Sequence, residues 1–195
     1  MRGKALKRSA VTITALVAVA LLGGALGCGG VELQARGYLE AAHEEGLKVT
    51  KNIEKLSKIT ATAKPENIEE IRKLYIEFVG QIGAVKISAE ETKSEYEKVL
   101  KLEDVEKYKE FADLQIKALD ELINEMGFIG ELYTLYNKVD EDRAAGRPID
   151  EITVSNQTKE LIVKIGKADE EIAKVKKDAA DIGDELNLPF LKEKK

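Results

Sequence analysis

Apolar residues recur at alternating spacings of three and four along this chain, from about residue 36 to residue 188. This spacing places them on one face of an α-helix, and it does not fit the two-residue period of a β-strand. The chain is therefore predicted to be all-α. In the first segment the repeat is carried by Leu39, Ala42, Gly46, Val49, Ile53, Leu56, Thr60 and Ala63.

Interruptions of the repeat divide it into four helical segments. Pro65 follows the first segment and is predicted to be the first helical position of the second. The phase slips before Asp104, which is predicted to be the N-cap of the third segment. Residues 140–150 are predicted to form a loop, and the fourth segment is predicted to end near residues 187–189.

Four segments of this length, each with one apolar stripe, favour an antiparallel up-down-up-down four-helix bundle. Short connections make neighbouring helices antiparallel. The alternative is a three-helix, spectrin-like bundle in which the second and third segments form one long helix, because neither glycine nor proline marks the break between them. In either case residues 36–188 form one domain, and residues 189–195 form a polar tail.

The N-terminus has the layout of a secretory signal. The first eight residues are basic, with Arg2, Lys4, Lys7 and Arg8 and no acidic residue, and an apolar run follows over residues 10–26. Residues 1–27 are therefore predicted to be a signal peptide, and the rest of the chain is predicted to be exported.

The sequence Ala25-Leu26-Gly27-Cys28 resembles the lipobox of bacterial lipoproteins, which are cut before a cysteine that carries diacylglycerol. Gly27 and Cys28 match this pattern, whereas Ala25 and Leu26 stand in the reverse of the usual order. The resemblance implies lipid attachment at Cys28 and a tether over residues 28–35. It places the protein on the outer face of the cytoplasmic membrane or in the periplasm or outer membrane. Cleavage by an ordinary signal peptidase and an uncleaved anchor are the alternatives.

The charge of the exported part limits its partners. From Cys28 onward the chain has 27 basic and 36 acidic residues, a net charge of −9. This charge repels nucleic acid and anionic lipid headgroups. Membrane attachment is therefore expected only through the lipid, and the expected partner of the bundle is another protein. The single cysteine excludes an internal disulfide and a cysteine-rich metal site.

No residue pattern predicts catalysis, a metal or a cofactor. Glu40 and His43 have the Glu-x-x-His spacing of di-iron bundles, but such sites need this motif twice, and His43 is the only histidine. His43 is therefore predicted to lie in solvent or on the flank of a helix. Because a base with a pKa near neutrality is scarce and Cys28 is assigned to lipid attachment, the protein is predicted not to be an enzyme.

Glycines inside the helical segments are the least expected feature, because each costs about 1 kcal/mol relative to alanine. Counted from the turns, they lie near mid-height. One interpretation is a narrow waist with a small apolar ligand cavity, and the other is close helix packing with aromatic side chains filling the space. The candidate residues of this waist are Gly80, Gly83, Gly127, Gly130, Gly166, Phe78, Phe128 and Tyr133.

These features favour a non-enzymatic, membrane-tethered envelope lipoprotein whose bundle acts as a helical interaction or spacer module. The alternative is a solute-binding or sensory four-helix bundle that uses the cavity. The oligomeric state stays open, because apolar stripes can close within one chain or between two chains.

Overall fold

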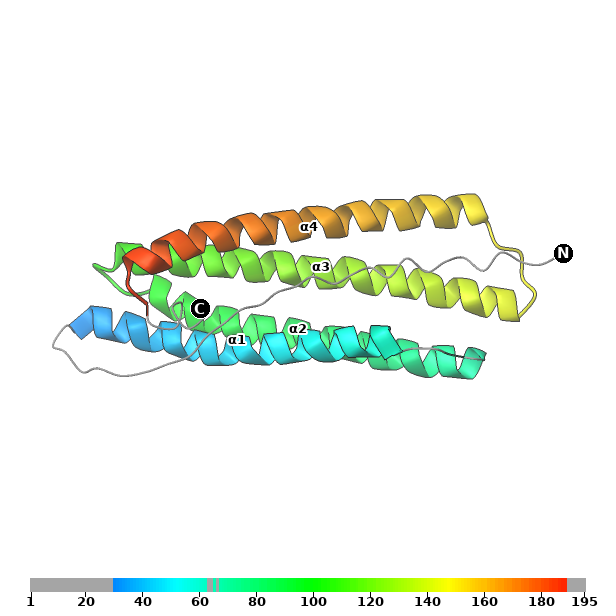
Figure 1. Ribbon diagram of the computed structural model, residues 1–195, viewed down its shortest axis with the longest axis horizontal. Helices are drawn as coiled ribbons and strands as arrows, with labels where there is room; N and C mark the ends of the chain where they lie inside the picture. The colour runs from blue at the N-terminus through cyan, green and yellow to red at the C-terminus, as the bar shows by residue number, and fades with distance from the viewer. Residues whose placement is uncertain (1–29, 63–64, 66, 189–195) are drawn as a thin grey trace.

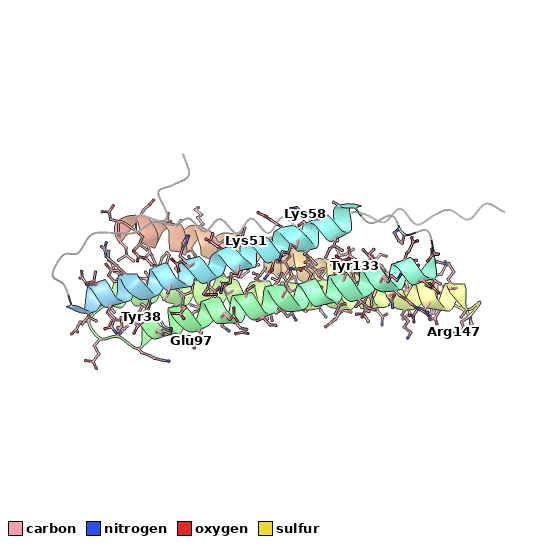
Figure 2. All side chains as sticks on the ribbon, turned by 90° about the horizontal axis from the view of Figure 1, so that it is seen from below. Tyr38, Lys51, Lys58, Glu97, Tyr133 and Arg147 are labelled. Carbon is pink, nitrogen blue, oxygen red and sulfur yellow. The ribbon has the colours of Figure 1, made fainter. Side chains whose placement is uncertain are left out.

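The protein forms four antiparallel α-helices in a computed structural model that describes residues 30–62, 65 and 67–188. The helices are α1 (Gly30–Thr62), α2 (Ile68–Leu100), α3 (Glu106–Ala144) and α4 (Glu151–Glu185), and the described residues contain no strand. Figures 1 and 2 show from two directions that all four run along the long axis. The predicted four-helix all-α fold is confirmed. The fused alternative is wrong, because α2 and α3 are separate helices.

The helices pack in chain order. Close backbone contacts join α1 to α2, α2 to α3 and α3 to α4, whereas α1 and α4 approach each other closely at few points among the described residues. At the end near the turn between α2 and α3, Arg36 of α1 donates a hydrogen bond to the Tyr108 hydroxyl of α3 (2.9 Å). Across the gap it donates a hydrogen bond to the carbonyl of Leu186, the C-cap of α4 (3.4 Å). The bundle therefore has one loosely packed side, between its first and last helices.

Helix α1 begins at Gly30, six residues before the start that the apolar repeat indicated. Ala35 explains the difference, because it continues the stripe one turn ahead of Leu39 and is fully buried with it. The segment 28–35 assigned to a tether is thus helical over most of its length.

Two predicted helix starts differ from the structure. Pro65 is not the first helical position of α2. The N-cap of α2 is Asn67, whose side-chain oxygen accepts a hydrogen bond from the Glu70 backbone N–H at 3.0 Å. Asp104 is not the N-cap of α3. It has φ of 58°, and Val105 takes the N-cap position. Aspartate tolerates this left-handed conformation, which the short turn between α2 and α3 uses.

The connection between α3 and α4 is shorter than predicted, because α3 continues to Ala144. Gly146 then has φ of 66°, where only glycine is unstrained, and the backbone N–H of Arg147 donates to the Asp142 carbonyl at 2.8 Å. This pattern is a Schellman motif, which satisfies the last carbonyls of a helix. Asp150 caps α4 by accepting a hydrogen bond from the Thr153 backbone N–H at 3.1 Å.

The buried apolar side chains form two clusters along the bundle. The loop-side cluster lies toward the connection between α3 and α4. It contains Val49, Ile53, Leu56, Phe78, Ile82, Val85, Ala89, Leu122, Met126, Ile129, Leu132, Leu161, Ile165 and Ile172. The turn-side cluster lies toward the turn between α2 and α3. It contains Ala35, Leu39, Ala42, Tyr96, Val99, Val105, Tyr108, Phe111, Ala112, Ala179, Leu186 and Leu188.

Candidate functional site

Polar residues occupy the junction between the two apolar clusters. Along α1 the junction falls between Ala42 and Val49, and it contains His43. On α2 the corresponding position contains Thr92, and on α4 it contains the buried Val175 and the partly buried Lys176. Among the described residues, four polar side chains are buried, namely His43, Ser88, Thr92 and Glu125.

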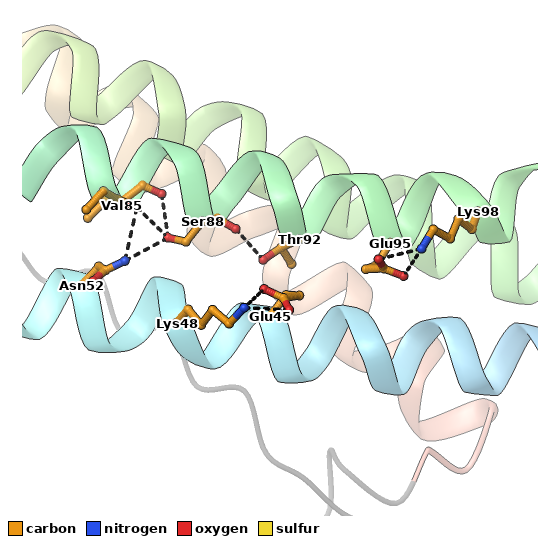
Figure 3. A network of polar contacts seen from close by, with 9 residues as sticks. Glu45, Lys48, Asn52, Val85, Ser88, Thr92, Glu95 and Lys98 are labelled. Atoms are coloured by element: carbon orange, nitrogen blue, oxygen red, sulfur yellow. Dashed lines mark hydrogen bonds and ion pairs between the residues drawn. The ribbon is translucent and has the colours of Figure 1, made fainter.

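The polar side chains between α1 and α2 are hydrogen-bonded, as Figure 3 shows. The Ser88 hydroxyl lies 2.9 Å from the Ala84 carbonyl, and the Asn52 amide of α1 donates to Ser88 Oγ at 3.3 Å. The Thr92 hydroxyl donates to the Ser88 carbonyl at 2.8 Å. Because these groups are satisfied, they fix the register of α1 on α2 and offer little to a ligand.

Among the described residues, Glu125 of α3 is the one buried carboxyl, with 1% of its surface exposed. Its Oε2 atom has no hydrogen-bond partner. Burial and, to a lesser extent, the negative charge of Asp169 on α4 raise the pKa of Glu125 to about 7, while Lys176 on α4 opposes the shift. Burial also raises the pKa of Asp169 and lowers that of Lys176. These three residues form a partly desolvated charge cluster between α3 and α4.

His43 is buried, with 2% of its surface exposed, so the prediction that it lies in solvent or on a helix flank is wrong. The physical reason is the width of the buried stripe on α1, which includes both Ala42 and His43 because α1 covers the interior of a four-helix bundle rather than one neighbour. Burial lowers the pKa of His43 to about 4, so the imidazole is neutral at pH 7. Within the described residues, no three histidine, cysteine or acidic side chains are grouped to hold a metal ion.

The aromatic residues of the predicted waist have different surroundings. Phe78 of α2 is buried and stacks on Tyr133 of α3, with ring centroids 3.7 Å apart and an interplanar angle of 21°. Phe128 is partly buried, and the Lys164 amine of α4 lies 5.7 Å from its ring centroid. The structure therefore brings together Phe78 and Tyr133 but gives Phe128 a different neighbour.

The glycines of the predicted waist also fall into two groups. A Cβ atom added to Gly130 would lie 3.7 Å from Ile82 Cδ1, and one added to Gly127 would lie 3.4 Å from Lys86 Nζ, so both glycines face α2. A Cβ atom added to the other three glycines would enter open space; these are Gly80, Gly83 and Gly166. Close helix packing thus accounts for at most two of the five.

A surface groove of about 630 Å³ lies between α2, α3 and α4, toward the connection between α3 and α4. Gly130 lines it and is the one residue of the predicted waist that does so. Its apolar part includes Val79, Ile82, Leu135 and Leu161, and its charged part includes Glu131, Lys138, Glu160 and Lys164. Sequence reasoning missed most of these residues. The sequence feature that could have predicted the groove is the pair Gly130 and Thr134, which lie one turn apart on α3. Their small side chains leave a depression between the larger side chains of α2 and α4.

Cys28 and the predicted signal peptide lie outside the described residues. Among the residues that the structure describes, no helix is both long enough and apolar enough to cross a membrane.

The fold and these sites define the class of the protein as an all-α, four-helix bundle. Neither a scan against models of protein families nor searches of curated proteins and of solved structures give a match to this chain.

Proposed function

We propose that this protein is a non-enzymatic envelope lipoprotein, whose bundle acts at the membrane surface as a helical interaction or spacer module. The observation that carries the proposal is the position of Cys28 after the apolar run and two residues before Gly30, the first residue of α1. Acyl chains at Cys28 would hold this end of α1 at the membrane, because two or more chains anchor a protein stably.

The shape and charge of the bundle support a role in protein contacts. A helix of 33 residues, such as α1, is about 50 Å long, so a tethered bundle can carry a contact surface well away from the lipid headgroups. The net charge of −9 from Cys28 onward disfavours binding of the bundle itself to anionic lipid.

Replacing Cys28 with alanine is expected to move the protein from the membrane fraction to the soluble fraction, or to leave it as an unprocessed precursor. The reason is that alanine has no thiol to receive diacylglycerol. Cell fractionation, together with mass spectrometry of the N-terminal peptide, measures both results. Ser57→Ala, which changes a hydroxyl far along α1, is the control and should stay in the membrane fraction. An unmodified thiol on wild-type Cys28 would contradict the lipoprotein proposal.

A second candidate function, solute binding, is favoured by the groove between α2, α3 and α4. Its volume of about 630 Å³ lies within the range of small-molecule sites, and it combines apolar residues with a few charged ones. The site differs from the mid-bundle cavity expected from the glycines, because it lies on the surface.

Gly130→Leu tests the groove, because the new side chain would occupy space next to Ile82. In a thermal-shift screen, a small molecule that raises the melting temperature of the wild-type protein is expected to lose this effect in the variant. Gly166→Leu, which places the same side chain in open space on α4, is the matched control and should keep it. Equal shifts in all three proteins would exclude the groove as the binding site.

A further inference from the structure

The outer face of α2 is apolar in its middle and has no helix packed on it among the described residues. Ile76 and Ile87 are 69% and 63% exposed, and Val79 lies between them and is also exposed. Gly80 and Gly83 share this face, and Cβ atoms on either would enter open space. We call these five residues the α2 outer strip. The two large isoleucines are separated by 11 residues, or about three helical turns, so they point in nearly the same direction.

Charged residues of opposite sign lie at the two ends of the strip. Arg72 and Lys73 precede it, and Glu90 and Glu91 follow it, all four with exposed side chains. Each basic residue is 18 residues from one acidic residue, which is five helical turns, so the pairs lie on the same lines along the helix. Over residues 72–91 the face is therefore basic at one end, apolar in the middle and acidic at the other end. Within the same chain, Arg72 also pairs with Glu141 of α3 at 3.3 Å, and Glu90 pairs with Lys93 at 3.4 Å.

This order of residues is complementary to itself. When two copies of α2 lie antiparallel, with a two-fold axis at the level of Gln81 and Ile82, Ile76 of one copy faces Ile87 of the other. Gly80 faces Gly83 in the same way, so the two backbones can approach closely at the centre. Lys73 of each copy then lies opposite Glu91 of the other. In a parallel pair, like charges would face each other at both ends, so the charges select the antiparallel arrangement.

We propose that the α2 outer strip is the contact surface of a symmetric, antiparallel homodimer. A second copy of this chain is the partner because its own α2 supplies the apolar surface, the small residues and the opposite charges at the required positions. Such an interface uses the same patch on both subunits, as two-fold dimers do. It involves mainly one helix from each copy, so the buried area is small and the dimer is expected to be weak and concentration-dependent.

The arrangement has a geometric consequence. Because α1 and α2 are antiparallel neighbours, Gly30 lies at the end of the bundle where α2 finishes. The two-fold axis therefore puts the Gly30 ends of the two copies at opposite ends of the dimer. Val79 of the strip also lines the groove between α2, α3 and α4, but the contact needs neither lipid nor a ligand in the groove, so it does not depend on the proposed function.

Charge reversal tests the proposal without touching the core. Sedimentation velocity of the full chain in density-matched detergent is expected to show a monomer–dimer equilibrium. Lys73→Glu or Glu91→Lys alone is expected to raise the dissociation constant about tenfold, because each places like charges together at two symmetric positions. The double variant Lys73→Glu/Glu91→Lys is expected to return the dissociation constant to near the wild-type value.

Two further measurements complete the test. Ile87→Asp is expected to abolish the dimer, whereas Ile152→Asp, at an exposed position on α4, should leave it intact. Melting curves by circular dichroism verify that each variant is folded. Carbodiimide treatment of a mixture of ¹⁴N- and ¹⁵N-labelled protein should join Lys73 of one copy to Glu91 of the other. A wild-type chain that stays monomeric at its highest soluble concentration, or a double variant that stays as weak as the single variants, overturns the proposal.

Discussion

Replacing Glu125 with glutamine is expected to stabilise the bundle by about 2–3 kcal/mol at pH 8 and to change its stability little at pH 4.5. The pKa of the Glu125 carboxyl is raised from 4.5 to about 7, first by burial and then by Asp169. Between pH 4.5 and pH 7 the folded protein keeps a proton that the unfolded chain has released. The wild-type free energy of unfolding therefore falls as the pH rises through this window, and glutamine removes that fall because it has no charge.

Urea unfolding followed by circular dichroism at the two pH values measures the effect. In this variant Lys176 keeps one acidic neighbour, because it also interacts with Asp169. Glu131→Gln, an exposed change on the same helix, is the control and should leave the pH dependence as it is in the wild type. If Glu125→Gln shifts the unfolding midpoint equally at both pH values, Glu125 is not the buried titrating group.

Replacing His43 with glutamine is expected to change the pH dependence of the free energy of unfolding in the opposite sense to Glu125→Gln. The pKa of His43 falls from 6.5 to about 4 on burial, so between these values the unfolded chain binds a proton that the folded protein does not. Wild-type stability should therefore decrease by about 2 kcal/mol as the pH falls from 7 to 4.5 because of this residue. The variant should lack this decrease, although it is expected to be less stable than the wild type at pH 7 through poorer packing.

The same unfolding series at pH 7, 6 and 4.5 measures the His43 contribution as the difference between the variant and the wild type. If the difference in free energy of unfolding between the variant and the wild type does not change with pH, the predicted contribution of His43 is refuted. In the wild type, the contributions of His43 and Glu125 have opposite slopes between pH 4.5 and pH 6.5, so they offset each other. Asp169, whose pKa is also raised by burial, adds to the slope of Glu125. The two variants are therefore needed to separate the contributions of His43 and Glu125.

The helix boundaries show how far local sequence signals reach. The apolar repeat located all four helices, and Gly146 marked the end of α3, because one glycine in a left-handed conformation is a local requirement. The errors at Pro65 and Asp104 arose where two neighbouring residues could each start a helix. At the start of α2, the decisive factor was the hydrogen bond between Asn67 and Glu70, which the spacing of apolar residues does not encode.

The candidate site was less accessible from the sequence. Glu125 and His43 look like ordinary polar residues beside an apolar stripe, and their burial depends on how many helices surround each stripe. The five glycines of the predicted waist looked alike in the sequence, yet two face α2 and three face open space. Which side of a helix is outside follows from the packing of the neighbouring helices, so no count along the chain could separate them.

By itself, the sequence determined that the chain is helical, that its segments fold back on one another and that the surface is acidic, since these properties follow from residue type and spacing. Only the tertiary structure decided that α1 and α4 are loosely joined, that Glu125 lies without a hydrogen bond to Oε2, and that the α2 outer strip is exposed. The physical reason is that burial and desolvation depend on the relative positions of helices distant in the chain, whereas helix formation depends mainly on residues within a few turns.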